Sequence, residues 1–127
     1  MKKNYTAINN QIPQGVILNS GPGLTKMQLV TDKFLNAWNN GDAQACVNTY
    51  SKEALFMTPE FSTIKGREAI RKSFEGEVPK NIGEMKITEK VQEVIYFGDW
   101  ATMQGLGNVV MQKPDSTEEN SSFKWQC

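Results

Sequence analysis

The sequence predicts one α+β domain in which helices pack on one face of a bent antiparallel sheet. The chain has 127 residues, which suits a single domain with one core. Apolar residues recur with a helical period in its first half, whereas its second half alternates with the two-residue period of strands. Helices followed by a run of antiparallel strands are typical of the α+β class.

The first segment, residues 1–23, contains two prolines and three glycines and has no sustained apolar period. We expect a flexible N-terminal arm here, followed by the folded domain over residues 24–127. An alternative gives the segment a function, in which its apolar side chains pair with a partner or lie over a pocket. Those side chains are Ile12, Val16, Ile17 and Leu18.

Two helices are expected next. Thr25 and Gln28 form a capping-box pattern, which predicts a helix that starts at Thr25 and ends at Gly41. Its apolar stripe consists of Met27, Val30, Phe34, Ala37 and Trp38. Asp42 follows directly and can cap a second helix that extends to Tyr50.

A short strand and a third helix follow. The apolar run 54–58, bounded by Pro59, predicts a strand, and the residues up to Gly66 are expected to form a loop. The helix then begins with the sequence REAIRKSF, in which Ile70 and Phe74 share one face. Its cationic side could hold an anion or could be a solvated face; the residues are Lys65, Arg67, Arg71 and Lys72.

A long antiparallel hairpin is predicted around the reversal at Gly98 and Asp99. In the first arm, one face carries the alternating residues Met85, Ile87, Val91, Ile95 and Phe97. In the second arm, one face carries Ala101, Met103, Gly105, Gly107, Val109 and Met111. These small groups could leave a cavity above the sheet, or the glycines could permit bulges and curvature. A further strand starts within residues 121–127.

The composition excludes several classes of function. Lys plus Arg equal Asp plus Glu at 14 each, so no net charge attracts nucleic acid or an anionic membrane. Histidine is absent, which removes the commonest metal ligand and general base, and we expect neither a metal nor a cofactor. Two cysteines and the lack of a long apolar span favour a reduced, cytoplasmic protein without membrane contact.

The order of these motifs resembles the nuclear transport factor 2-like superfamily, in particular its SnoaL-like and ketosteroid-isomerase-like branch. The resemblance rests on FLNAWNNGDAQACVNTYSKEALFMTPEF, KGREAIRKSF and the hairpin around FGDWATMQGLGNVV, and covers about residues 25–127. It implies a cone-shaped, cystatin-like roll, in which a curved antiparallel sheet with helices on one face encloses a mostly apolar pocket. Such a pocket is the default candidate for a binding site.

The resemblance also implies where catalytic groups of the isomerase branch would lie. The position of the base, immediately before Pro59, holds Thr58, and the position of a tyrosine donor holds Phe34. No acid occurs in residues 121–127, where a second donor would lie. The one residue of the isomerase pattern that is kept is a tyrosine eight positions before Thr58, which is Tyr50. Threonine cannot serve as a base near neutral pH, and phenylalanine has no hydrogen-bond donor. We therefore expect a hollow without a proton-handling group, with Glu60 as the nearest replacement carboxylate.

The predicted function is the non-catalytic binding of a small apolar molecule in the cone pocket. The alternatives are a cyclase or isomerase that uses Glu60 and Tyr50, and an association domain that forms homo-oligomers. The side chains expected to line the pocket come from every element that should face the cone. They are Phe34, Trp38, Tyr50, Met57, Thr58, Phe74, Met103 and Gly105.

Members of this superfamily usually continue beyond the equivalent of FKWQC with one more strand. We therefore expect the sheet to end in an open edge, which is a pairing hazard unless it is covered. The chain could be C-terminally incomplete, the N-terminal arm could complete the sheet, or a second copy could cover it. A homodimer formed through the sheet is the expected outcome.

Overall fold

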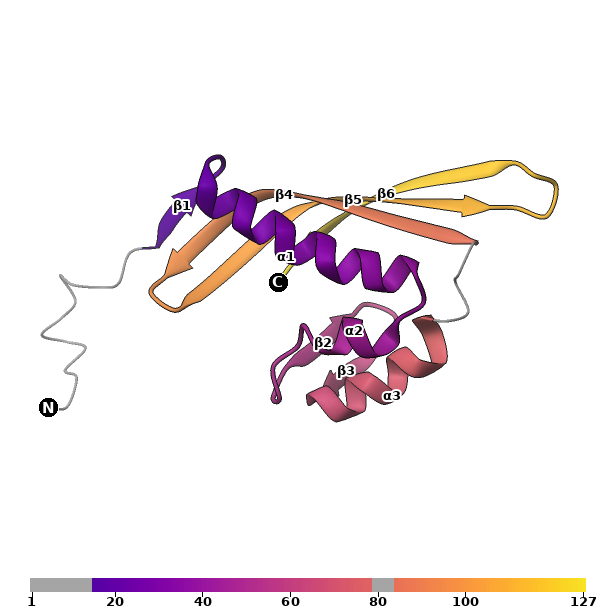
Figure 1. Cartoon of the computed structure of the whole chain (residues 1–127), viewed down its shortest axis with the longest axis horizontal. Helices are drawn as coiled ribbons and strands as arrows, with labels where there is room; N and C mark the ends of the chain where they lie inside the picture. The colour runs from indigo at the N-terminus through magenta and orange to yellow at the C-terminus, as the bar shows by residue number, and fades with distance from the viewer. Residues whose placement is uncertain (1–14, 79–83) are drawn as a thin grey trace, which may run out of the picture.

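The computed structural model describes residues 15–78 and 84–127. The predicted arm therefore lies mainly outside the described residues, as do Ile12 and the segment 79–83. The first half of the chain mixes helices with short strands, and long strands form the second half (Figure 1). In chain order the elements are β1 (Val16–Leu18), α1 (Pro22–Asn39), α2 (Ala43–Val47), β2 (Leu55–Thr58), β3 (Phe61–Lys65), α3 (Arg67–Glu77), β4 (Met85–Phe97), β5 (Trp100–Gln112) and β6 (Glu118–Gln126).

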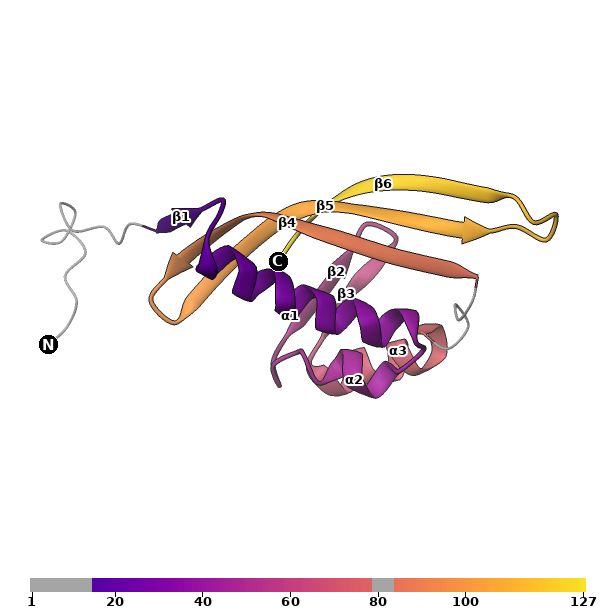
Figure 2. The same cartoon turned by 45° about the horizontal axis from the view of Figure 1, so that its top comes forward.

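The main sheet is antiparallel, with the strand order β1-β4-β5-β6. Helix α1 runs along one face of this curved sheet, and α2, α3 and the separate β2–β3 hairpin lie on the same side (Figures 1 and 2). The predicted α+β class, with a curved sheet and helices on one face, is confirmed. Strand β6 is an edge of the sheet among the described residues.

The N-terminal segment contributes to this sheet. Val16, Ile17 and Leu18 pair with Tyr96, Ile95 and Val94 of β4. The last part of the predicted arm is thus a short edge strand. All three residues of this strand pair with β4, and the side chains of Val16 and Ile17 are 59% and 63% exposed.

Helix α1 begins earlier than predicted. Pro22 occupies its first turn, where a residue without an N–H group is tolerated, and Gly21 precedes it with a φ of 85°. The Thr25 hydroxyl donates to the Gly21 carbonyl at 3.1 Å, and the predicted capping box does not form. The Gln28 side chain reaches the sheet instead, because its amide bonds to the backbone of β4.

Two amide side chains of α1 hold it against the open edge of β4. Gln28 Nε2 donates to the Glu89 carbonyl at 2.9 Å, and its Oε1 accepts from the Val91 N–H at 2.7 Å. Asn39 makes the same paired contact with the carbonyl and N–H of Ile87, at 2.8 and 2.9 Å. These bonds satisfy backbone groups that no neighbouring strand reaches. They therefore fix the helix along the stretch of β4 beyond β1.

A helical core lies between α1, α2 and α3. Asp42 caps α2 as predicted, because its Oδ1 accepts from the Ala45 N–H at 3.0 Å. Residues 61–65 form β3 and pair with β2, where the sequence predicted only a loop. The fully or nearly fully buried members of this core are Ala37, Ala43, Cys46, Val47, Ile70, Phe74 and Val78.

A β-bulge in β4 changes which side chains face the helices. The pairing with β5 shifts between Val91 and Glu93, so the alternation continues with the opposite parity beyond this point. Val94 is therefore fully buried, whereas Phe97 is 43% exposed. The single face predicted from Met85 to Phe97 is correct only up to Val91, since one extra residue exchanges the two faces of a strand.

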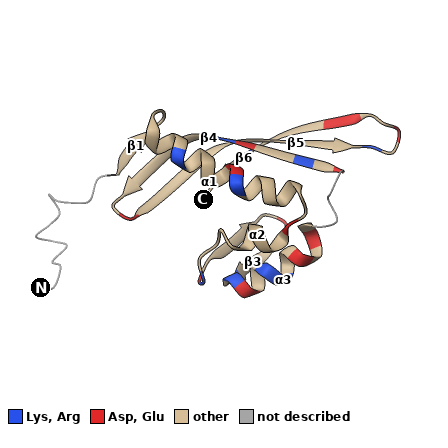
Figure 3. Cartoon of the chain, in the orientation of Figure 1, with Lys and Arg blue, Asp and Glu red and all other residues tan. Residues whose placement is uncertain are grey.

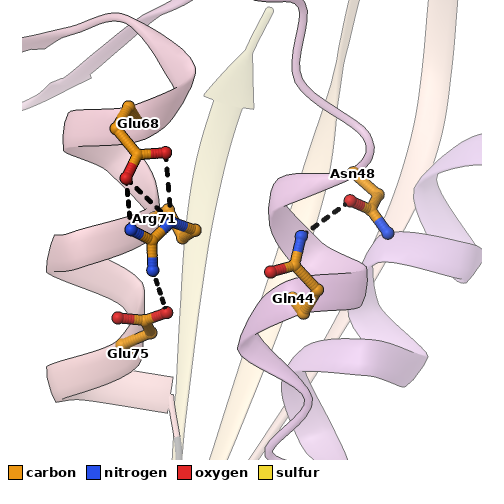
Figure 4. A network of polar contacts seen from close by, with 5 residues as sticks. All are labelled: Gln44, Asn48, Glu68, Arg71 and Glu75. Carbon is orange, nitrogen blue, oxygen red and sulfur yellow. Dashed lines mark hydrogen bonds and ion pairs between the residues drawn. The ribbon is translucent and has the colours of Figure 1, made fainter.

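The cationic side of α3 is neutralised in part by its own helix. Arg71 forms ion pairs with Glu68 and Glu75, one turn before and after it (Figure 4). Arg and Lys residues share this helix with Glu residues, so charges of both signs occur along it (Figure 3). This arrangement fits a solvated helix face better than an anion site.

Candidate functional site

A cavity of about 600 Å³ lies between α1, the α2–β2 connection and the main sheet. Its wall is mostly apolar and aromatic. The lining residues are Val30, Thr31, Phe34, Leu35, Trp38, Thr49, Tyr50, Ser51, Phe56, Phe74, Ile87, Glu89, Met103, Phe123, Trp125, Gln126 and Cys127.

Five packed aromatic rings form one wall of this cavity. Phe34 and Trp38 lie one turn apart on α1, with ring centroids 6.1 Å apart. Phe74 of α3 contacts both, and its ring meets Trp38 edge to face at 5.5 Å. Tyr50 and Phe56 complete the group, at 5.8 and 5.3 Å from Phe74. Each of these rings contacts at least two of the others, so the five rings pack as one aromatic wall.

Five of the eight residues predicted to line a pocket do line the cavity. They are Phe34, Trp38, Tyr50, Phe74 and Met103. Met57, Thr58 and Gly105 are not among the lining residues. Met57 is 71% exposed, because β2 turns its alternate residue Phe56 toward the cavity.

The two candidate catalytic residues are not brought together. Tyr50 lines the cavity, whereas Glu60 is exposed on the turn between β2 and β3, where its N–H bonds to the Thr58 hydroxyl. Burial raises the pKa of Tyr50 to about 12, with smaller contributions from Cys127, Cys46 and Glu89. Tyr50 therefore keeps its proton at neutral pH and can donate a hydrogen bond.

The cavity contains a carboxyl group that the sequence analysis did not single out. Glu89 of β4 lines the wall, and burial raises the pKa of its carboxyl. Within the described residues, its carboxyl has no hydrogen-bond or ion-pair partner. The signal was present in the alternation, because Glu89 stands between Ile87 and Val91 on one face of the strand. The expectation of a hollow without a proton-handling group is therefore wrong, because Glu89 lines the cavity.

The glycines of β5 accommodate aromatic rings of β6. Gly105 pairs with Trp125, and Gly107 pairs with Phe123. A Cβ atom on Gly107 would lie 2.1 Å from the Phe123 ring, and one on Gly105 would lie 2.9 Å from Trp125. The missing side chains therefore leave room for these rings, which both line the cavity, and at Gly105 also for the Lys90 carbonyl oxygen, 2.0 Å from where a Cβ would lie. The space that the glycines leave is filled at these two positions.

Two indole groups of the wall are unavailable to a ligand through their N–H groups. Nε1 of Trp38 and Nε1 of Trp125 are covered by protein atoms and have no hydrogen-bond partner among residues 15–78 and 84–127. A ligand in the cavity would meet the faces and edges of these rings. Glu89 is the one charged side chain among the lining residues.

Comparison with known proteins identifies the family. A family model for the SnoaL-like domain matches residues 31–124. The chain belongs to the SnoaL-like domain family. This assignment and the solved structures confirm the predicted superfamily, which is the nuclear transport factor 2-like group. No curated protein sequence matches the chain.

Several solved structures share the fold of this SnoaL-like domain. A ketosteroid isomerase-like protein from Erwinia carotovora has a TM-score of 0.64 at 14% identity, over 84% of this chain and 82% of that one. A domain of unknown function with a cystatin-like fold, from Nostoc punctiforme, has a TM-score of 0.64 at 21% identity and covers 80% of this chain and 62% of that one. The association domain of CaMKII from C. elegans has a TM-score of 0.65 at 16% identity and covers 80% of this chain and 79% of that one.

Neither a metal site nor a membrane-spanning helix is found in the part of the chain that the structure describes. No three His, Cys, Asp or Glu side chains of residues 15–78 and 84–127 lie together so that they could hold a metal ion. Among the same residues, no helix combines the length and apolar character needed to cross a membrane.

Proposed function

We propose that this SnoaL-like domain binds a small, mostly apolar molecule in the cavity of about 600 Å³. The observation that supports it is the packed aromatic wall of the cavity, which consists of Phe34, Trp38, Tyr50, Phe56 and Phe74. A preformed cavity with an aromatic wall is a typical small-molecule site. The apolar body of a ligand would lose water on binding, and the rings would not need to rearrange.

The cavity can be tested by filling it. Met103 lines the wall, so Met103→Trp should occupy the space with a large side chain. Met57→Trp is a matched control, because Met57 is 71% exposed and outside the cavity. Titration with the neutral fluorophore N-phenyl-1-naphthylamine should show saturable binding to the wild type and the control but not to Met103→Trp. Equal binding to all three proteins would contradict the proposal.

A second proposal concerns self-association through the sheet. It is supported by the open edge at β6, and by the likeness of the fold to an association domain. Leu106 and Met111 of β5 are 44% and 47% exposed, which adds apolar surface beside this edge. Light scattering over a concentration series should show a dimer. A monomer at every concentration would contradict this proposal.

A further inference from the structure

The charge inside the cavity is unbalanced. Among the residues that the structure describes, Glu89 is the only lining residue with a charged side chain, and no Lys or Arg belongs to the wall. Desolvation is the cause of the raised pKa of its carboxyl, with no contribution from a nearby cation. Moving a carboxylate away from water without a partner is unfavourable. The site therefore presents a negative group whose partner is not supplied by the described part of the chain.

The other titratable groups of the wall do not change this balance. Tyr50 has a pKa of about 12 and is uncharged at pH 8. Burial raises the pKa of the Cys127 thiol, with a smaller contribution from Glu89, so the neutral thiol is favoured. The lining residues of α1, β2, α3 and β5 are all without charge. Among the described residues, Glu89 is thus the lining side chain that can present a negative charge to a ligand.

The aromatic wall favours the same sign of ligand charge. Faces of Trp, Tyr and Phe rings attract cations, and this attraction grows where water is excluded. An anionic ligand would be repelled by Glu89 and would find no accessible indole N–H donor, since both indole nitrogens are covered. A neutral ligand would leave the carboxylate unpaired.

We propose that the cavity selects small molecules that join an apolar body to a protonated amine, with the ammonium group against the Glu89 carboxylate. This inference rests on the proposed binding function and names its ligand class. The apolar body would lie on the rings of Phe34, Trp38 and Phe74, and the ammonium would supply the missing positive partner.

Three indole compounds of nearly equal shape separate charge from apolar contact. Tryptamine is a cation at pH 8, tryptophol is neutral and indole-3-acetate is an anion. Calorimetric titration at pH 8 and low salt should show tryptamine binding about tenfold or more tightly than tryptophol, with indole-3-acetate the weakest. In Glu89→Gln, the advantage of tryptamine should disappear while tryptophol still binds.

A matched control lies on the same strand. Glu93 is beyond the bulge, bonds to Gln104 and is not a lining residue, so Glu93→Gln should keep the preference for tryptamine. The thermal unfolding midpoint of each variant verifies that it is folded. The pattern in which Glu89→Gln alone loses the preference supports the proposal.

The outcomes also separate the two levels of the hypothesis. If tryptophol binds as tightly as tryptamine, or if the preference survives Glu89→Gln, the amine inference is overturned and the binding function stands. The same conclusion follows if N-phenyl-1-naphthylamine enters the cavity but tryptamine does not. If neither the indoles nor the fluorophore bind, both proposals fail.

Discussion

Replacing Phe74 by alanine should destabilise the fold strongly. Phe74 is 3% exposed and joins rings from α1, the α2–β2 connection and β2. Its ring centroid lies 5.3–6.3 Å from four other aromatic rings. Removing a buried phenylalanine costs about 3–5 kcal/mol, because apolar contact is lost and a void remains. The surrounding rings hold one another, so little collapse into the void is expected and the upper part of this range applies.

The assay is reversible unfolding by denaturant and by heat. For 127 residues, a loss of about 4 kcal/mol lowers the thermal midpoint by roughly 15 °C. Phe61→Ala is a matched control, because Phe61 is 50% exposed and contacts a single ring, Phe56. Its loss should be about 1 kcal/mol. Equal losses in the two variants would refute the view that the ring cluster is a rigid core.

Three further predictions follow from the contacts. Gly107→Val should lower the thermal unfolding midpoint, because the new Cβ atom would lie 2.1 Å from the Phe123 ring of β6. Gly76→Ala is the control: a Cβ atom there would have no other atom within 4 Å, so this variant should gain up to about 1 kcal/mol in stability. Equal effects of the two substitutions would contradict the close approach of Phe123 to Gly107. Gln28→Met should cost about 2–4 kcal/mol by leaving backbone groups of β4 unbonded, and Gln44→Met, on an exposed helix face, should change stability little in denaturant titration. Burial raises the pKa of the Glu89 carboxyl in the folded state above its ordinary 4.5. The protonated carboxyl therefore favours the folded state below pH 4.5, and this contribution to the free energy of unfolding is lost as pH rises through the raised pKa. Glu89→Gln should thus gain in midpoint relative to the wild type on going from pH 4 to pH 7, and a constant difference would contradict the burial of this carboxyl.

Local patterns were sufficient for most of the elements. The stripe that contains Phe34 and Trp38 located the first long helix, and Asp42 located the start of the second. Gly98 located the turn of the long hairpin, where its φ is 61°. Each of these signals depends on residues close in sequence, so it survives without knowledge of the rest of the chain. The order of the elements then determined the α+β class and the family resemblance.

Long-range contacts decided the rest. The sequence allowed β1 to be a loose arm, and only its pairing with β4 makes it a strand. Glu89 lies on a face of β4 that the alternation already indicated, but only the fold shows what lies opposite, which is a ring-lined cavity without a Lys or Arg among the described lining residues.

Periodicity along the chain thus determined which residues share a face and where each element starts or turns. The folded chain decided whether the space above that face is filled or hollow, and which polar groups lack a partner there. The reason is physical: side-chain direction follows from the local backbone, whereas burial and charge balance depend on residues as far apart as Gln28 and Val91.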